Sequence, residues 1–213
     1  MDGLAAVLLL ARLGGLTPPY RMETARLVVR CWQPTDAAAL KEALDPSVEH
    51  LRPWLPWAHE EPKPLAEKAE LLRTFRGMFD LDQDYIYGIL ERDESRVLGG
   101  TGLHTRLTDD AREIGYWIRR DAEGHGYITE TVSALTRVGF ELGGLSRIEI
   151  RCNPDNHRSA AVPRRLGYRH VDTVDDSDGE PTMIWALDVA GYAGSPAAEL
   201  DLAAFDVLGE RLL

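Results

Sequence analysis

The sequence contains little of what several classes of protein require. Its 213 residues include only two cysteines, Cys31 and Cys152, and no cluster with metal-ligand spacing, so neither a disulfide scaffold nor a zinc site is expected. Both cysteines lie on predicted strands among apolar neighbours, which favours buried, reduced thiols and a cytoplasmic location. Basic residues are also scarce, since the chain has 24 basic and 35 acidic residues and its net charge is −11. Nonspecific nucleic-acid binding requires a basic surface and is therefore not expected.

Long hydrophobic runs are missing as well. The apolar stretch at residues 5–11 is far too short to span a bilayer, and the Met-Asp-Gly start lacks the basic residues of a signal peptide. We therefore expect no membrane segment. The remaining composition, with 44% hydrophobic and 28% charged residues, is that of an ordinary globular protein. The length suits one domain with a full core.

Alternating and helical patterns follow one another along the chain. Alternation predicts strands at residues 26–32, 84–91, 96–106, 114–118, 148–152, 168–174 and 182–189. Helical spacing predicts helices at residues 35–44, 65–79, 127–142 and from 156 onwards, with a shorter helical segment at 198–208. Gly99, Gly100 and Gly102 lie inside the third strand and indicate a bulge or a close backbone approach. No repeat or long linker divides the chain, so one mixed α/β domain is predicted.

A glycine turn at residues 123–127 (Glu-Gly-His-Gly-Tyr) opens the third predicted helix. Glycines let the chain pass close to a ligand, and the first amides of a helix lack internal partners, so the turn can hold a phosphate or a carboxylate. By itself a glycine-flanked helix start is usually only a turn. The dinucleotide fingerprint fails because Thr129 stands where its third glycine belongs, and no P-loop Gly-Lys-Ser/Thr is present.

Several motifs around this turn occur together in one order. A strand ending in Gly115-Tyr116-Trp117-Ile118 precedes the turn, and Gly126 stands at its first fixed glycine. The downstream pattern Asn-x-x-Ser…Leu-Gly-Tyr is found at Asn156, Ser159, Leu166, Gly167 and Tyr168. With these motifs the chain, from about residue 23 to about residue 188, resembles the GNAT N-acetyltransferase superfamily. Within it, the chain is most similar to the RimJ/RimL-like branch, which acetylates protein N-termini.

The resemblance implies an α/β (α+β) fold with a mixed, mostly antiparallel central sheet of about seven strands flanked by helices. The usual family start is similar to the sequence from Met22. Residues 1–21 are therefore expected to be an N-terminal extension, 22–190 the GNAT-type domain and 191–213 a C-terminal tail packed on it. The extension would come from an upstream start codon or form a helix docked on the domain or on a partner. Homodimers are common in the family, and the oligomeric state is left open.

Acetyl-CoA is the cofactor that the resemblance implies. Its pantetheine arm would lie along Trp117 and Ile118 like an added strand, and its pyrophosphate would take amides from the turn. The positions expected to contact it are Trp117, Ile118, Gly124, His125, Gly126, Tyr127, Ile128, Thr129, Asn156 and Ser159. Glu123 replaces the usual Gln or Arg, so its side chain is expected to point away from the phosphates. Ile128 replaces the usual Gly or Ala but can still offer its amide.

Acetyl transfer from a thioester to an amine needs a base for the amine, donors for the oxyanion and a proton for the leaving thiolate. Glu113 is the first candidate for the base, with a solvated carboxylate at a strand end as its structural alternative. The acidic turn at residues 175–180, especially Asp176 and Glu180, is its rival.

For the acid, many relatives use a tyrosine where Pro163 stands here. Ser159 is the substitute that the RimL-like branch implies, with helix capping as its structural alternative. Pro163 also lacks the amide that would bond the Ser159 carbonyl, which predicts a local kink. Asn156 is expected to cap the same helix. Cys152 as an acyl carrier lacks an obvious activating partner.

Prolines around Trp54 and Trp57 exclude a regular helix at residues 49–58. The two rings are expected either to cover the core or, as this loop does in relatives, to wall an acceptor pocket. The leading hypothesis is acetyl transfer from acetyl-CoA to a primary amine, a protein or peptide α-amine, by direct attack in a ternary complex. A small amine such as an aminoglycoside or a polyamine is the alternative acceptor, and a larger acyl group such as succinyl the alternative donor. A non-catalytic acyl-CoA sensor is the alternative class.

Overall fold

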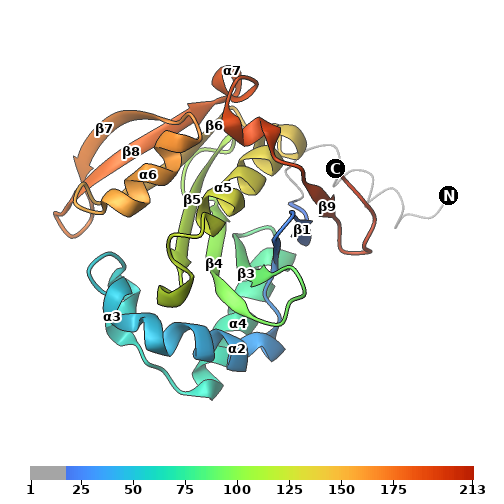
Figure 1. The fold of residues 1–213 in the computed structure, drawn as a ribbon, viewed down its shortest axis with the longest axis vertical. Coiled ribbons are helices and arrows are strands. Elements are labelled where there is room, and N and C mark those ends of the chain that lie inside the picture. The colour runs from blue at the N-terminus through green and yellow to red at the C-terminus, as the bar shows by residue number, and fades with distance from the viewer. Residues whose placement is uncertain (1–17) are drawn as a thin grey trace.

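One open sheet of nine strands organises the protein, and helices lie against it (Figure 1). The computed structural model describes residues 18–213, so most of the predicted N-terminal extension lies outside the described residues. The strands follow the order β7-β8-β6-β5-β4-β3-β2-β1-β9. Their bounds are β1 Arg21–Glu23, β2 Leu27–Cys31, β3 Tyr85–Glu91, β4 Val97–His104, β5 Ala111–Ile118, β6 Arg147–Cys152, β7 Arg169–Asp175, β8 Pro181–Asp188 and β9 Ala203–Phe205.

Helices cover both faces of this sheet. Their bounds are α2 Ala37–Leu44, α3 Val48–Leu51, α4 Leu65–Asp80, α5 Tyr127–Arg137, α6 His157–Arg165 and α7 Val189–Tyr192. One buried core joins α5 and α6 to the sheet through residues such as Val132, Leu135 and Ile148. A second core, on the opposite face, joins α2 and α4 to β2 and β3 through residues such as Leu40 and Leu72. Figure 1 shows α2, α3 and α4 grouped together, away from α5 and α6.

The predicted fold class is confirmed, and the predicted number of strands is wrong. All neighbouring strands run antiparallel except β5 and β6, which are parallel. The seven predicted strands are present within a few residues, but β1 and β9 bring the number to nine. Each of these two strands has three residues, which is too short for an alternating pattern to stand out.

The helical segment predicted at residues 198–208 is also wrong. A 3₁₀ turn, Pro196–Glu199, is followed by β9, which pairs with β1 at the edge of the sheet. Alanine and leucine favour a helix locally, but here the chain satisfies the unpaired backbone groups of β1 instead. Tertiary pairing therefore overrides local helix propensity in this segment.

The glycine-rich strand shows the bulge and the close approach that its sequence predicts. In the β3–β4 pair the register shifts between Ile89 and Leu90, opposite Gly99 and Val97. A Cβ atom built on Gly100 would lie 2.5 Å from the indole nitrogen of Trp117 on β5. The strand therefore needs glycine where the Trp117 ring crosses it.

Neither a membrane-spanning helix nor a metal-binding cluster is found among the residues that the structure describes. Within residues 18–213, no helix combines the length and the apolar composition that crossing a membrane requires. In the same part of the chain, no group of three or more His, Cys, Asp or Glu side chains is placed to hold a metal ion.

A buried ion pair anchors the tryptophan-bearing loop that connects α3 to α4. The Lys68 ammonium donates to a carboxylate oxygen of Glu61, and the two side chains are 0% and 5% exposed. The other Glu61 carboxylate oxygen accepts from the amide of Lys63 at 2.8 Å, and Arg52 donates to the Glu61 carbonyl at 2.9 Å. The segment around Trp54 and Trp57 is therefore held at its C-terminal end by fully engaged polar groups.

Replacing Lys68 by methionine should leave the Glu61 carboxylate buried without its cation. We expect the free energy of unfolding to fall by about 3–5 kcal/mol, as is usual when one partner of a buried pair is removed. Urea denaturation would measure it. The matched control on the same helix is Arg73→Met, whose partner Glu70 is 68% exposed, and a change within about 0.5 kcal/mol is expected there. Equal losses in the two variants would contradict the anchoring role.

Candidate active site

The central feature of the site is the fork between β5 and β6. The two strands pair over only three positions, from Ala111 with Arg147 to Glu113 with Glu149. Beyond Glu113, β5 pairs with β4 alone up to Ile118. This leaves residues 114–118 with a free edge on the β6 side.

Backbone groups of β5 face this free edge at alternate residues. The Arg119 amide donates to Leu98 of β4 at 2.8 Å, and the Thr101 hydroxyl of β4 donates to the Gly115 carbonyl at 2.8 Å. Because peptide groups alternate sides along a strand, those of Tyr116 and Ile118 point away from β4. The Ile118 carbonyl lies 3.1 Å from Nε2 of His50, a residue that sequence reasoning missed. An extended ligand could add to this edge as a further strand.

The predicted phosphate turn follows β5 directly. Gly124 and Gly126 have φ angles of +79° and +80°, which L side chains rarely adopt. Gly126 is the N-cap of α5, and no described side chain caps that helix start. The amides of residues 127–129 therefore lack intrahelical partners, as at any helix start, and the helix dipole adds positive potential there. The turn has the geometry of an anion site.

Arg26 brings a cation to the turn from a distant part of the chain. Its guanidinium donates to the His125 carbonyl at 2.9 Å and to Glu130 at 2.7 Å, and it lies 4.8 Å from the centre of the Tyr127 ring. Its side chain remains 48% exposed. Sequence reasoning missed this residue, because a single arginine before a strand carries no motif.

Glu123 is drawn away from the turn. Its carboxylate lies 2.7 Å from Nη1 of Arg158 on α6. The negative charge that replaces the usual Gln or Arg is therefore paired with a guanidinium. Next to the turn, a surface pocket of about 470 Å³ lies between α5 and the end of α6. Its lining includes the cations Arg26 and Arg165, the hydroxyls of Thr129 and Ser133, and the Glu130 carboxylate that pairs with Arg26.

Ser159 and Tyr116 meet on the face of the sheet that α6 covers. The Tyr116 hydroxyl donates to the Ser159 carbonyl at 3.1 Å and lies 3.0 Å from the Ser159 hydroxyl. Pro163 lies inside α6 and has no amide to offer that carbonyl. The tyrosine therefore takes the hydrogen-bonding position that the proline leaves open. Burial raises the pKa of Tyr116 far above its ordinary value, so its hydroxyl stays protonated.

Asn156 and Cys152 complete this side of the site. The Asn156 side chain accepts from the Ser159 amide at 3.0 Å and so caps α6 as the sequence predicts. Cys152 is 9% exposed, and burial raises the pKa of its thiol. A thiol kept protonated is a poor acyl carrier.

The other face of the fork carries Glu113. Its carboxylate lies 3.4 Å from Arg106 and 3.7 Å from Arg151, and its side chain is 13% exposed. Trp117 belongs to the same face, and the Trp57 ring packs edge-on against it at 6.3 Å between centroids. The structure therefore brings Glu113, Trp117 and Trp57 to one face and Ser159 with Tyr116 to the other.

Trp54 and the acidic turn lie further out. Trp54 and Trp57 are 39% and 41% exposed, so neither ring is closed into the core. In the acidic turn, Asp176 accepts the amides of Asp178 and Glu180 at 2.9 and 3.0 Å, which is the bonding of a structural turn. No described contact joins this turn to Glu113 or Ser159.

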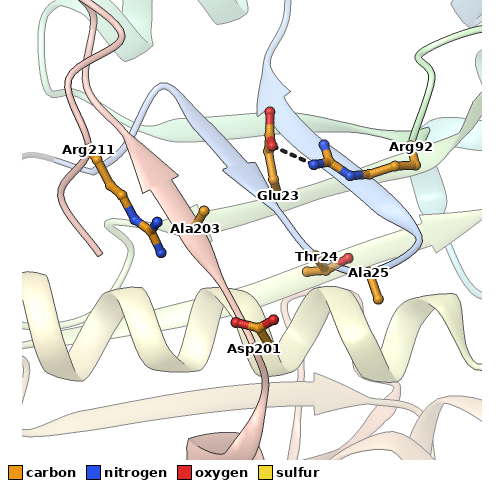
Figure 2. Close-up of a pocket in the computed structure, with 7 residues that line it drawn as sticks. All are labelled: Glu23, Thr24, Ala25, Arg92, Asp201, Ala203 and Arg211. Atoms are coloured by element: carbon orange, nitrogen blue, oxygen red, sulfur yellow. Dashed lines mark ion pairs between the residues drawn. The ribbon is translucent and has the colours of Figure 1, made fainter.

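A second pocket, of about 370 Å³, lies at the β9 end of the sheet (Figure 2). Figure 2 shows Glu23 turned toward Arg92, and these two side chains pair at 2.7 Å. Arg211 and Asp201 approach it from the C-terminal segment. None of the predicted site residues lines this pocket.

Comparisons with known proteins agree with this geometry. The chain matches the acetyltransferase (GNAT) domain family over residues 26–169. It is similar to YdaF of Bacillus subtilis, a protein named as a ribosomal N-acetyltransferase, at 30% identity over 67% of this chain and 77% of that protein. It is also similar to the ribosomal protein uS5-alanine N-acetyltransferase of Escherichia coli, at 26% identity over 71% of this chain and 79% of that protein.

Solved structures share the fold. RimJ of Mycobacterium smegmatis, in complex with CoA-disulfide, superposes with a TM-score of 0.73 at 19% identity, covering 84% of this chain and 92% of that one. RimL, a ribosomal L7/L12 α-N-protein acetyltransferase in complex with coenzyme A, gives 0.71 at 19% identity, covering 79% and 97%.

Tyr116 and Pro163 should be energetically coupled through the Ser159 carbonyl. Tyr116→Phe leaves that carbonyl without a donor and should cost about 1–3 kcal/mol in the free energy of unfolding. In the double variant with Pro163→Ala, the new amide can bond the carbonyl, so the combined cost should be less than the sum of the two single costs. A urea-denaturation double-mutant cycle measures this. Costs that add to within about 0.5 kcal/mol would rule the coupling out.

Proposed function

The chain belongs to the GNAT acetyltransferase family, and on this premise we propose that it transfers an acetyl group from acetyl-CoA to a primary amine, the α-amine of a protein or peptide. The observation that carries the proposal is the fork at β5. A free strand edge, a phosphate turn and a hydroxyl pair lie along one path there, over residues 114–127 and Ser159.

The described residues fit the phosphate end of acetyl-CoA. The turn offers free amides at residues 127–129 and glycine conformations that bring the backbone close to a ligand. Arg26 adds a guanidinium that is half exposed beside the turn. We assign the pyrophosphate to this turn and the nucleotide end to the pocket lined by Arg26 and Arg165. Arg165 is exposed and has no ion pair with any described residue, so it is free to meet a phosphate.

The acyl end belongs at the fork. The free edge of β5 suits an arm that bonds like an added strand, along Trp117 and Ile118 as the sequence predicts. When bound, acetyl-CoA supplies the thioester whose C–S bond breaks. Ser159, with the protonated Tyr116 hydroxyl beside it, is placed to give a proton to the departing sulfur. We assign the removal of the amine's proton to the opposite face of the sheet, which carries Glu113.

The acceptor belongs on the Trp57 and Trp117 face. Both relatives named above act, by name, in ribosomal or ribosomal-protein N-acetylation, which supports a protein α-amine for this chain. The exposed Trp54 and Trp57 rings supply an apolar wall beside the fork. A net charge of −11 suits a cationic acceptor.

The test is release of free coenzyme A from acetyl-CoA with a panel of amines. Peptides with different N-terminal residues, peptides with internal lysine and blocked N-termini, spermidine and an aminoglycoside separate the acceptor classes. We expect release with free peptide N-termini. Ser159→Ala should lower kcat by about 100-fold or more while the acetyl-CoA Kd changes little. Turnover with spermidine or the aminoglycoside alone would show that the acceptor is a small amine and not a peptide. Binding of acetyl-CoA without turnover on any amine would indicate a sensor.

Gly126→Arg should weaken cofactor binding. A side chain at this position requires a strained φ of +80° and fills the space before the amides of α5, so affinity should fall by roughly tenfold or more. Isothermal titration calorimetry with acetyl-CoA measures it. The matched control is Gly179→Arg, at a glycine with the same φ of +80° in the β7–β8 turn, where a Cβ atom would meet nothing within 4 Å. Unchanged affinity in Gly126→Arg, or equal losses in both variants, would refute the phosphate-turn assignment.

A further inference from the structure

We propose that His104, oriented by Asp84, is the group that accepts the proton of the attacking amine. This inference rests on the proposed acetyl transfer and names its base. His104 ends β4 and stands directly opposite Glu113 of β5. That is the last position at which β5 still pairs with β6, so the imidazole lies at the fork itself.

The imidazole is held in one orientation. Its Nδ1 lies 2.8 Å from Oδ2 of Asp84, and the two side chains are only 12% and 13% exposed. The other carboxylate oxygen of Asp84 accepts from the Thr105 amide at 3.2 Å. Because a carboxylate can only accept, Nδ1 carries the proton of the neutral ring. Nε2 is then the basic nitrogen, and no described residue hydrogen-bonds to it.

Asp84 is suited to support a positive charge on this ring. Burial by itself would raise the pKa of Asp84, but the hydrogen bond from His104, the charge of its imidazolium form and the backbone amides outweigh it and bring the pKa below its ordinary value. The carboxylate therefore stays ionised at neutral pH. An ionised partner on Nδ1 stabilises the imidazolium that forms when Nε2 takes a proton.

The imidazole lies against two glycines, Gly102 and Gly115. A Cβ atom on Gly102 would lie 2.4 Å from Nε2, and one on Gly115 would lie 3.2 Å from it. Side chains alternate between the faces, so His104, Gly102 and Gly100 of β4 share one face with Gly115 and Trp117 of β5. Between the imidazole and the Trp117 wall, these two strands therefore contribute only glycine to this face. The ring and the proposed acceptor wall occupy one continuous surface.

Glu113 is less suited to take the proton. Its carboxylate faces the guanidiniums of Arg106 and Arg151, at 3.4 and 3.7 Å. Each of its two carboxylate oxygens is therefore already engaged by a guanidinium. The only ion pair of His104 among the described residues is the one with Asp84. Glu113 therefore contributes negative charge near the amine, and His104 contributes the basic lone pair.

The proton and electron pairs balance in this arrangement. Nε2 takes a proton from the amine nitrogen, whose lone pair forms the C–N bond with the acetyl carbonyl carbon. The C–S bond breaks, and the sulfur leaves with its electron pair and takes a proton from the Ser159–Tyr116 pair. The imidazolium, paired with Asp84, then returns its proton to solvent, and the Ser159–Tyr116 pair takes one proton back from solvent.

His104→Gln is the sharpest test, because the amide of glutamine can still donate to Asp84 but has no basic nitrogen. We expect kcat/KM for the peptide to fall by about 100-fold or more, with the acetyl-CoA Kd unchanged by calorimetry. His104→Ala should lose as much and recover part of its rate when imidazole is added to the assay. Asp84→Asn should lower kcat with little change in KM, because Asp84 positions the ring and does not touch the amine. The fall in rate caused by Asp84→Asn should be smaller than the fall caused by His104→Gln.

Glu113→Gln is the matched control on the facing strand, and a loss of about tenfold or less is expected because it removes charge and not the base. A His104→Gln rate within about threefold of wild type, or a loss in Glu113→Gln that exceeds it, would overturn the assignment of the base to His104. So would the absence of imidazole rescue in a His104→Ala protein that still binds acetyl-CoA. If the wild-type protein itself acetylates no amine, the proposed function fails together with this inference.

Discussion

The parting of β5 from β6 after Glu113 is the constraint on which the rest of the structure depends. Parallel strands that stay paired have no free backbone groups between them, so a site here requires them to separate. The separation exposes the peptide groups of Tyr116 and Ile118 and sends β5 into the glycine turn that begins α5. It also makes an opening in the sheet that both faces border, and the two faces carry different side chains there. Tyr116 and Ser159 lie on one, and Glu113, His104 and Trp117 lie on the other.

Contacts from elsewhere in the structure compensate for several departures from the family pattern. Pro163 occupies the position of a tyrosine and leaves the Ser159 carbonyl without an amide, and the Tyr116 hydroxyl of β5 reaches both oxygens of that serine. Glu123 places a negative charge beside the phosphate turn, where Arg158 pairs with it. Arg26 supplies a cation to the turn from the start of β2. In each case the compensating side chain comes from a different element.

The sequence predicts much of this fold because most of its elements are regular. The predicted strands at β3 and β8 lie within one residue of the observed ones, and α4 and α5 repeat their apolar residues at helical spacing, so local pattern and tertiary structure agree. The segment at residues 198–208 looks helical by composition and forms β9, because its partner β1 lies almost the whole chain away. The glycine turn, the Asn156 cap and the glycine bulge were also predictable, since each rests on a few consecutive residues.

The candidate site was predictable only where a motif marks it. Residues in the turn and the Asn-x-x-Ser pattern stand out in the sequence, whereas Arg26, His50 and the His104–Asp84 pair do not. The sequence by itself determined seven of the nine strands, the longer helices, the glycine turn and the family, because these depend on neighbours within one turn or one strand. The tertiary structure alone decided which side chains face one another across the fork. Such contacts depend on strand order and register, which bring together residues as distant in the sequence as Arg26 and Glu130. No local sequence pattern encodes these contacts.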